Sequence, residues 1–181
     1  DIDLNLQDFK KRVNSDLVGK VINIASRSAS FVVKKYNKQL SAKCIERPLY
    51  DEVVEAGSDI AKHYEARNFS KAMRLIMKLA DKANQYIDEK KPWQLAKIEG
   101  KEKEVHEITS LAINLFKVLI IYLKPVLPEM AKSSEEFLNV DSLNWSDIES
   151  PLTNHKINKF KALMTRIEDE QIDQMVESSK I

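Results

Sequence analysis

The stretch that decides the fold is EKEVHEITSLAINLFKVLIIYLKPVL, residues 102–127. It begins as an amphipathic helix, with apolar side chains at positions 105, 108 and 111, and is apolar on nearly every side from Leu115 to Leu127. A helix that is apolar all round has to be covered on all sides by other elements. The stretch therefore predicts a buried central helix, which Pro125 and Pro128 bend or end.

Other segments carry the apolar stripes of helices that could cover this core. Apolar residues recur every three or four positions from Leu6 to about Leu40, which predicts one long helix. The polar stretch from Asn37 to Pro48 is predicted to break it. A weaker stripe follows, then a clearer one that ends before Pro92. Together these segments predict an all-α fold, an antiparallel bundle of about five helices. The weaker stripe covers residues 50–64, the clearer one 69–87, two further helices are predicted at 129–138 and 168–178, and residues 139–153 are predicted to be irregular.

The composition agrees with a helical protein of one domain. The 181 residues are 43% hydrophobic and 31% charged, and they include three glycines and one cysteine. So few glycines disfavour a phosphate-cradling loop, a Rossmann crossover or a turn-rich β sandwich. The lone Cys44 excludes a disulfide framework and a Cys-rich zinc site, and it favours a cytoplasmic location. The most apolar run, residues 118–123, is far shorter than the ~20 residues that a bilayer requires, so no membrane association is expected.

The charge is nearly balanced in total but uneven along the chain. Residues 8–47 hold ten basic and three acidic side chains, whereas residues 134–150 hold five acidic and no basic ones. A basic face of this kind is typical of a protein that binds a polyanion. An ordinary solvated helix surface is the alternative that the pattern leaves equally open.

No catalytic or metal-binding constellation is visible in the sequence. The three histidines, His63, His106 and His155, lie in three separate segments without further ligands at the spacing of a metal site. We therefore predict no catalytic residue and no metal ligand.

Five polar residues of the first long helix are predicted to share one face. On a helical wheel they fall within about 60° of one another. Lysine and arginine on such a ridge suit phosphate contacts, and asparagine and arginine can also read base edges. A solvated face is the alternative. The residues are Lys20, Asn23, Arg27, Lys34 and Lys38.

A second candidate feature is Trp93 in the segment Lys90-Lys91-Pro92-Trp93. The proline fixes the backbone at a helix junction, so the indole would be held rigidly beside two cations. A flat aromatic ring next to lysines is a common means of stacking an unpaired base. The alternative is that Trp93 packs between helices. Trp145, in the acidic irregular stretch, is predicted to anchor that stretch by packing.

These features together resemble the anticodon-binding domain of methionyl-tRNA synthetase. The similarity covers essentially all 181 residues in the family's order, and it implies a single helical domain over residues 1–181, with 155–181 as a C-terminal closing segment. The segments that carry it are Val21-Ile22-Asn23-Ile24-Ala25-Ser26-Arg27, Lys91-Pro92-Trp93, Ile113-Asn114-Leu115-Phe116, Tyr122-Leu123-Lys124-Pro125-Val126-Leu127-Pro128 and His155-Lys156-Ile157-Asn158 with Phe160-Lys161-Ala162-Leu163.

The resemblance implies specific roles for the residues already singled out. Asn23, Arg27 and Trp93 would contact the CAU anticodon of methionine tRNA, with Trp93 near the cytosine and Pro92 shaping its setting. Weaker RNA contacts would come from Lys20, Lys34 and Lys91. The implied partners are methionine tRNA and the catalytic domain of the same chain.

The sequence departs from the family in one respect. The His-Ile-Gly-His-like and Lys-Met-Ser-Lys-Ser-like motifs of the family's catalytic half do not occur in these 181 residues. We therefore expect a C-terminal fragment without its own catalysis or cofactor, since ATP and methionine would bind the absent catalytic domain of the parent ligase. Two alternatives remain: the anticodon domain of a class I synthetase for another aliphatic amino acid, or a protein-interaction bundle with a basic docking helix.

Overall fold

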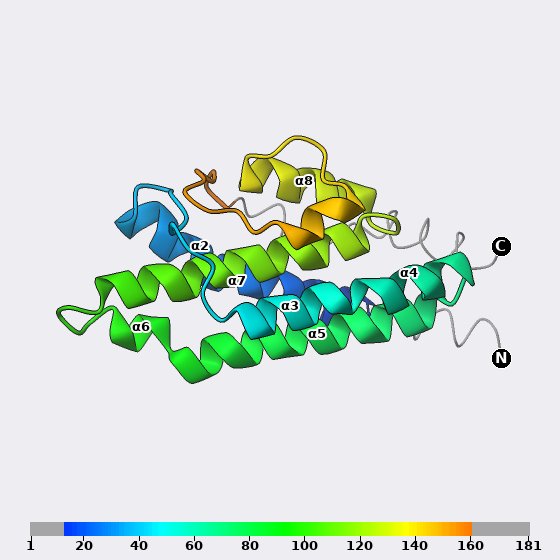
Figure 1. Ribbon diagram of the computed structural model, residues 1–181, viewed down its shortest axis with the longest axis horizontal. Coiled ribbons are helices and arrows are strands. Elements are labelled where there is room, and N and C mark those ends of the chain that lie inside the picture. The colour runs from blue at the N-terminus through cyan, green and yellow to red at the C-terminus, as the bar shows by residue number, and fades with distance from the viewer. Residues whose placement is uncertain (1–12, 161–181) are drawn as a thin grey trace.

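The computed structural model describes residues 13–160, and these form an all-α bundle (Figure 1). Within this range the pairing of Gln39 with Lys156 is an isolated antiparallel bridge, and no strand is formed. The predicted all-α class is therefore confirmed. The α-helices are α2 (Gly19–Lys35), α3 (Arg47–Glu55), α4 (Gly57–Glu65), α5 (Phe69–Lys90), α6 (Pro92–Leu95), α7 (Glu102–Leu123) and α8 (Pro128–Leu138). A π-helical turn, Val13–Val18, leads into α2, and a 3₁₀ turn, Trp145–Glu149, follows α8.

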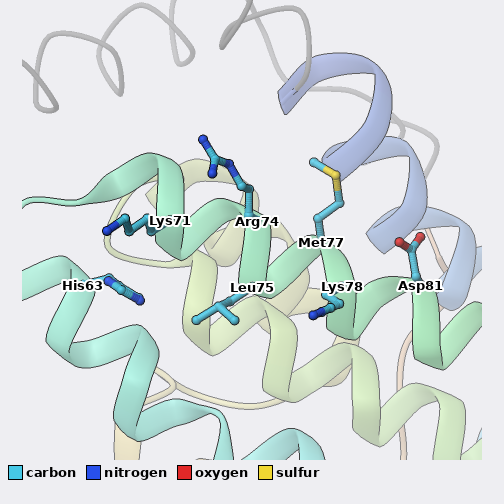
Figure 2. A pocket seen from close by; sticks show the side chains of 7 residues that line it. All are labelled: His63, Lys71, Arg74, Leu75, Met77, Lys78 and Asp81. Atoms are coloured by element: carbon cyan, nitrogen blue, oxygen red, sulfur yellow. The ribbon is translucent and has the colours of Figure 1, made fainter.

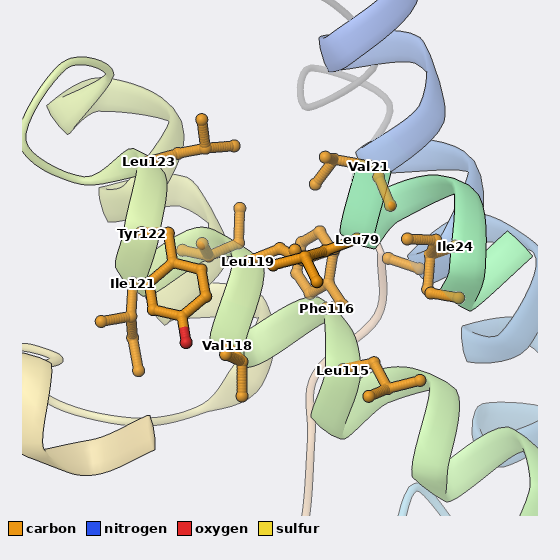
Figure 3. Close-up of a cluster of buried hydrophobic side chains, with 14 of the residues drawn as sticks. Val21, Ile24, Leu79, Leu115, Phe116, Val118, Leu119, Ile121, Tyr122 and Leu123 are labelled. Carbon is orange, nitrogen blue, oxygen red and sulfur yellow. The ribbon is translucent and has the colours of Figure 1, made fainter. Parts of the chain in front are cut away.

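Helix α7 is the buried centre of the bundle, as its sequence predicts. Every residue from Ile108 to Leu123 is buried, and the helix packs against α2, α3, α5, α6 and α8 (Figures 1 and 3). It ends at Leu123, four residues before the predicted boundary, because Pro125 has no N–H with which to continue the helix. Among the described residues α7 is also the one helix long and apolar enough to cross a membrane, but 89% of its most apolar window is buried within the protein. Its hydrophobicity is therefore that of a core helix.

The weaker predicted stripe, residues 50–64, forms two short helices, α3 and α4, which meet at Ala56. At this junction Gly57 lies directly against α7, because a Cβ built there would be 3.0 Å from the Tyr122 hydroxyl. The hydroxyl of Tyr122 donates to the carbonyl of Val53 at 2.7 Å. The backbone at position 57 can therefore lie this close to α7 only because glycine has no Cβ.

Helix α2 ends at Lys35, close to the break predicted from Asn37, although the apolar stripe runs on to about Leu40. Asn37 and Lys38 adopt left-handed backbone conformations, with φ of 54° and 64°. The chain then pairs with a segment far along the sequence: the Leu40 N–H donates to His155 at 2.8 Å. Lys38 is consequently outside the helix, so its predicted place on the polar ridge of α2 is wrong.

A polar stripe on the otherwise apolar α7 holds the irregular segments in place. Ser110 accepts a bond from the backbone N–H of Ser41 at 2.9 Å. Asn114 exchanges two bonds with the backbone of Leu152, at 3.0 and 2.6 Å. Lys117 donates to the carbonyl of Asp147 at 2.8 Å. These positions bind backbone groups that would otherwise be buried without a partner.

The predicted anchoring role of Trp145 is confirmed. Its ring centroid lies 5.1 Å from that of Tyr122 and 6.4 Å from that of Tyr64. The first part of the closing segment packs on this same domain, since the Phe160 ring meets that of Phe137 edge-on at 5.2 Å. The predicted terminal helix at 168–178 and the start of the first predicted helix, residues 6–12, lie outside the described residues.

The buried ionisable groups give the stability of this fold a defined pH dependence. Burial lowers the pKa of Lys117 from 10.5 to about 8, and it raises the pKa of all five tyrosines. Between about pH 8 and 10 the unfolded chain therefore keeps the Lys117 proton that the folded chain releases, so the free energy of unfolding rises with pH. Above about pH 10 the unfolded tyrosines lose protons that the folded ones keep, so the free energy of unfolding falls.

Urea denaturation at a series of pH values measures this profile. We expect a shallow maximum near pH 10 and a steep loss above it, because five tyrosines outweigh one lysine. The Lys117→Met variant should lack the rise but keep the steep loss. A monotonic fall from pH 8 in the wild type would contradict the environment assigned to Lys117.

Candidate nucleic-acid interface

Helices α2 and α5 lie side by side and hold each other through a ladder of polar side chains. Each partner on α5 lies 61 residues after the residue that it contacts, so the two helices run in the same direction in constant register. The three rungs are Lys20 Nζ to Asp81 Oδ1 at 2.7 Å, Asn23 Nδ2 to Asn84 Oδ1 at 3.2 Å, and Arg27 Nη2 to Asp88 Oδ1 at 2.6 Å. We call this set of six residues the α2–α5 ladder.

The middle rung ties a side chain of α5 to the backbone of α2. Asn84 donates to the carbonyl of Lys20 at 3.0 Å and to that of Ala80 at 3.2 Å. Its amide oxygen accepts from Asn23, which is exposed. The Asn23 side chain is thereby fixed in orientation at the edge of the helix pair.

The α5–α6 junction presents Trp93. Helix α5 ends as Lys91 takes a left-handed conformation with φ of 49°, and Pro92 opens α6 at the first helical position, where a missing N–H costs nothing. Pro92 is buried, and the next side chain, Trp93, is 39% exposed. The indole is therefore partly exposed beside a buried proline, and it is not packed wholly between helices.

Arg27 brings the ladder and the tryptophan together. Its guanidinium carbon lies 5.2 Å from the centre of the Trp93 ring, while Nη2 binds Asp88. The ion pair and the cation–π contact hold the guanidinium from two sides. The Arg27 side chain is 23% exposed, so part of it reaches the surface next to the indole.

The structure unites some of the predicted site residues and separates others. Asn23, Arg27 and Trp93 form one patch where α2, α5 and α6 meet. Lys34 lies exposed two helical turns beyond Arg27, whereas Lys20 is engaged with Asp81 at the far end of the ladder.

Sequence reasoning missed the α5 half of the ladder. Its residues Asp81, Asn84 and Asp88 hold the polar ridge of α2 in place. One signal was available, since their spacing repeats the i, i+3, i+7 spacing of Lys20, Asn23 and Arg27. Only the register of the two helices shows that the sets face each other.

A basic cavity of about 520 Å³ lies between α4 and α5, on the side of the ladder away from Trp93 (Figure 2). Three cations, Lys71, Arg74 and Lys78, line it together with His63. Along α5, Lys71 lies about 28 Å and Lys78 about 18 Å from the end that carries Trp93. Asp81, the first α5 residue of the ladder, also lines the cavity. Across residues 13–160 no group of histidine, cysteine and carboxylate side chains is arranged to hold a metal ion.

Comparison with known proteins gives the family at the level of sequence. Residues 39–179 match the family described as the anticodon binding domain of methionyl tRNA ligase. A methionine–tRNA ligase of Vesicomyosocius okutanii subsp. Calyptogena okutanii is 64% identical over 180 residues, 99% of this chain and 33% of that protein. One from Psychrobacter cryohalolentis is 57% identical over 180 residues, 99% of this chain and 26% of that protein. The chain thus spans about a third or less of the length of these relatives.

The fold agrees with that of a solved synthetase. Free methionyl-tRNA synthetase of Mycobacterium tuberculosis superposes with a TM-score of 0.77 at 19% identity, over 88% of this chain and 34% of that one. The same enzyme bound by methionyl-adenylate gives a TM-score of 0.76 over 85% of this chain and 32% of that one. From the sequence match over most of its length, the chain belongs to the family of anticodon-binding domains of methionyl-tRNA ligases.

Proposed function

We propose that this chain binds methionine tRNA and recognises its CAU anticodon. The observation that carries the proposal is the Arg27 guanidinium held against the exposed ring of Trp93 where α2, α5 and α6 meet. This patch combines a stacking surface with oriented polar donors, and proteins use these two features to recognise an unpaired base.

Each residue of the patch has a distinct role in the proposal. The indole of Trp93 stacks on the cytosine, and such stacking tolerates any base. Selectivity therefore has to come from side chains that hydrogen-bond a base edge. Arg27 and Asn23, which the ladder holds in fixed orientations, supply those donors. Lys34 and Lys91 contribute contacts to backbone phosphates.

In the parent protein we propose that this domain positions the tRNA for a catalytic domain of the same chain. That domain would bind ATP and methionine and carry out the ligase reaction, in the two thirds or more of the relatives' length that this chain does not cover. The proposed location is the cytoplasm, where tRNA is charged.

A gel-shift comparison tests the recognition directly. Methionine tRNA should bind the chain more tightly than the same tRNA with one anticodon base replaced, at equal salt. Equal affinity for both RNAs would refute anticodon recognition and leave only general RNA binding.

Lys34→Ala should weaken binding of every tRNA to a similar degree. A lysine that neutralises one phosphate releases its counterions, so losing it should lower the slope of log K against log salt by about 0.7–0.9. Filter binding at several salt concentrations measures the slope. The matched control is Lys62→Ala, which removes an exposed lysine from α4 and should leave the slope unchanged. An unchanged slope for Lys34→Ala would place this side chain away from the RNA.

A further inference from the structure

A second apolar side chain stands out from the surface close to Trp93. In the part of the chain that the structure describes, two large hydrophobic side chains are exposed, Trp93 at 39% and Ile98 at 51%. Scattered apolar residues are ordinary on protein surfaces. Here both lie within one span of six residues, at the end of the bundle that carries the candidate interface (Figure 1).

The backbone around Ile98 is held in fixed turns. Its N–H donates to Leu95 at 2.9 Å, and its carbonyl accepts from Lys101 at 3.3 Å. Gly100 completes the reversal toward α7 with φ of 89°, a conformation that side-chain-bearing residues rarely adopt. Ile98 is therefore presented by an ordered backbone, so little ordering is left to be done when a partner binds.

Ile98 and Trp93 lie close enough to contact one RNA loop. The turn between Leu95 and Ile98 keeps their α-carbons within about 7 Å, and Trp93 is two residues from Leu95. The two side chains thus leave the backbone within about 14 Å of each other. A nucleic-acid strand advances about 3.4 Å per stacked nucleotide, so this distance spans a few nucleotides.

The charge around Ile98 suits an RNA. Residues 90–101 contain four lysines and one glutamate. Lys90 is ion-paired with Glu46 and Lys101 with Glu104, so the phosphates of a polyanion would meet Lys91 and Lys97. The unpaired bases of a loop offer the apolar faces that Ile98 requires. Single-stranded RNA has both properties, because charged phosphates and bases with apolar faces alternate along the strand.

We propose that Ile98 is a second RNA-contacting side chain, which packs against an unpaired nucleotide of the anticodon loop outside the triplet. The contact depends on the anticodon recognition proposed above, and it extends the interface beyond Asn23, Arg27 and Trp93. Because an aliphatic side chain forms no hydrogen bonds, the contact adds affinity and fixes the position of the loop without choosing the base.

The first test measures affinity for methionine tRNA. Ile98→Ala should weaken binding about fivefold, from the loss of apolar surface that the nucleotide covers. Ile98→Leu is the matched control and should bind like the wild type, and neither change should move the melting temperature. Unchanged affinity of Ile98→Ala would overturn the proposal. That outcome is expected if this surface binds a protein partner.

The second test locates the nucleotide. Methionine tRNAs with a single abasic nucleotide, placed in turn at each of the two loop positions on either side of the triplet, are compared for wild type and Ile98→Ala. At one position the abasic change should weaken the wild type about fivefold and the variant hardly at all. Equal losses for both proteins at all four positions would overturn the contact.

Trp93→Ala, measured alongside, separates loss of the Ile98 contact from loss of anticodon recognition. If it weakens binding while Ile98→Ala does not, only the added contact fails. If neither variant weakens binding, the anticodon recognition itself fails.

Discussion

Trp93→Ala is expected to weaken binding of methionine tRNA by about 1–3 kcal/mol, because it removes a surface on which a base stacks. The ring is 39% exposed and lies under the Arg27 guanidinium, so it contributes less to the core than a buried tryptophan does. The melting temperature should therefore change little. Fluorescence or filter binding gives the affinity, and circular dichroism gives the melting curve.

Two further variants determine whether stacking is the cause. Trp93→Phe should recover part of the affinity, since a smaller ring still stacks. Replacing the cytosine of the anticodon should weaken the wild type sharply and Trp93→Ala much less, because the two losses overlap. The control Trp145→Ala removes a packed ring and should lower the melting temperature. If Trp93→Ala behaved like that control, with RNA binding lost only in proportion to unfolding, Trp93 would be a structural residue.

Arg27→Ala is the second large expected effect, a loss of about 1–3 kcal/mol in affinity for methionine tRNA. The guanidinium is held by Asp88 and the Trp93 ring, so its free donors are already oriented before RNA arrives. Arg27→Lys keeps the charge but loses the planar fork, so it should recover little. An equal loss of affinity for all tRNAs would show that Arg27 contacts only the RNA backbone.

The ladder introduces a second possible cause, which one more variant separates. Removing Arg27 leaves the carboxylate of Asp88 without its partner, and a free carboxylate repels RNA. The double variant Arg27→Ala with Asp88→Asn removes that repulsion. If the Arg27 donors contact a base, the double variant stays weak. Recovery to wild-type affinity would mean that the role of Arg27 is to neutralise Asp88.

Much of the fold follows from local sequence patterns. The apolar run of α7 predicts a buried central helix, because only a helix covered on every side can be apolar all round. Pro92 and Pro128 mark the starts of α6 and α8, since proline is favoured at the first helical position. The break after α2 also follows from the polar residues 37–48 and Pro48, but the path of the chain beyond the break does not, because Leu40 bonds with His155, a residue far along the chain.

The candidate site, too, follows partly from local sequence and partly from tertiary structure. The sequence by itself determined which side chains are the candidates for RNA contact: the arginine and asparagine on one face of α2, and a tryptophan preceded by proline. Tertiary structure alone decided that Arg27 lies over Trp93 and that Asp81, Asn84 and Asp88 hold the polar ridge. Periodicity specifies which face of a helix is polar, because that depends on neighbours one turn away. The register of one helix against another depends on how the whole core packs, and no local pattern contains it.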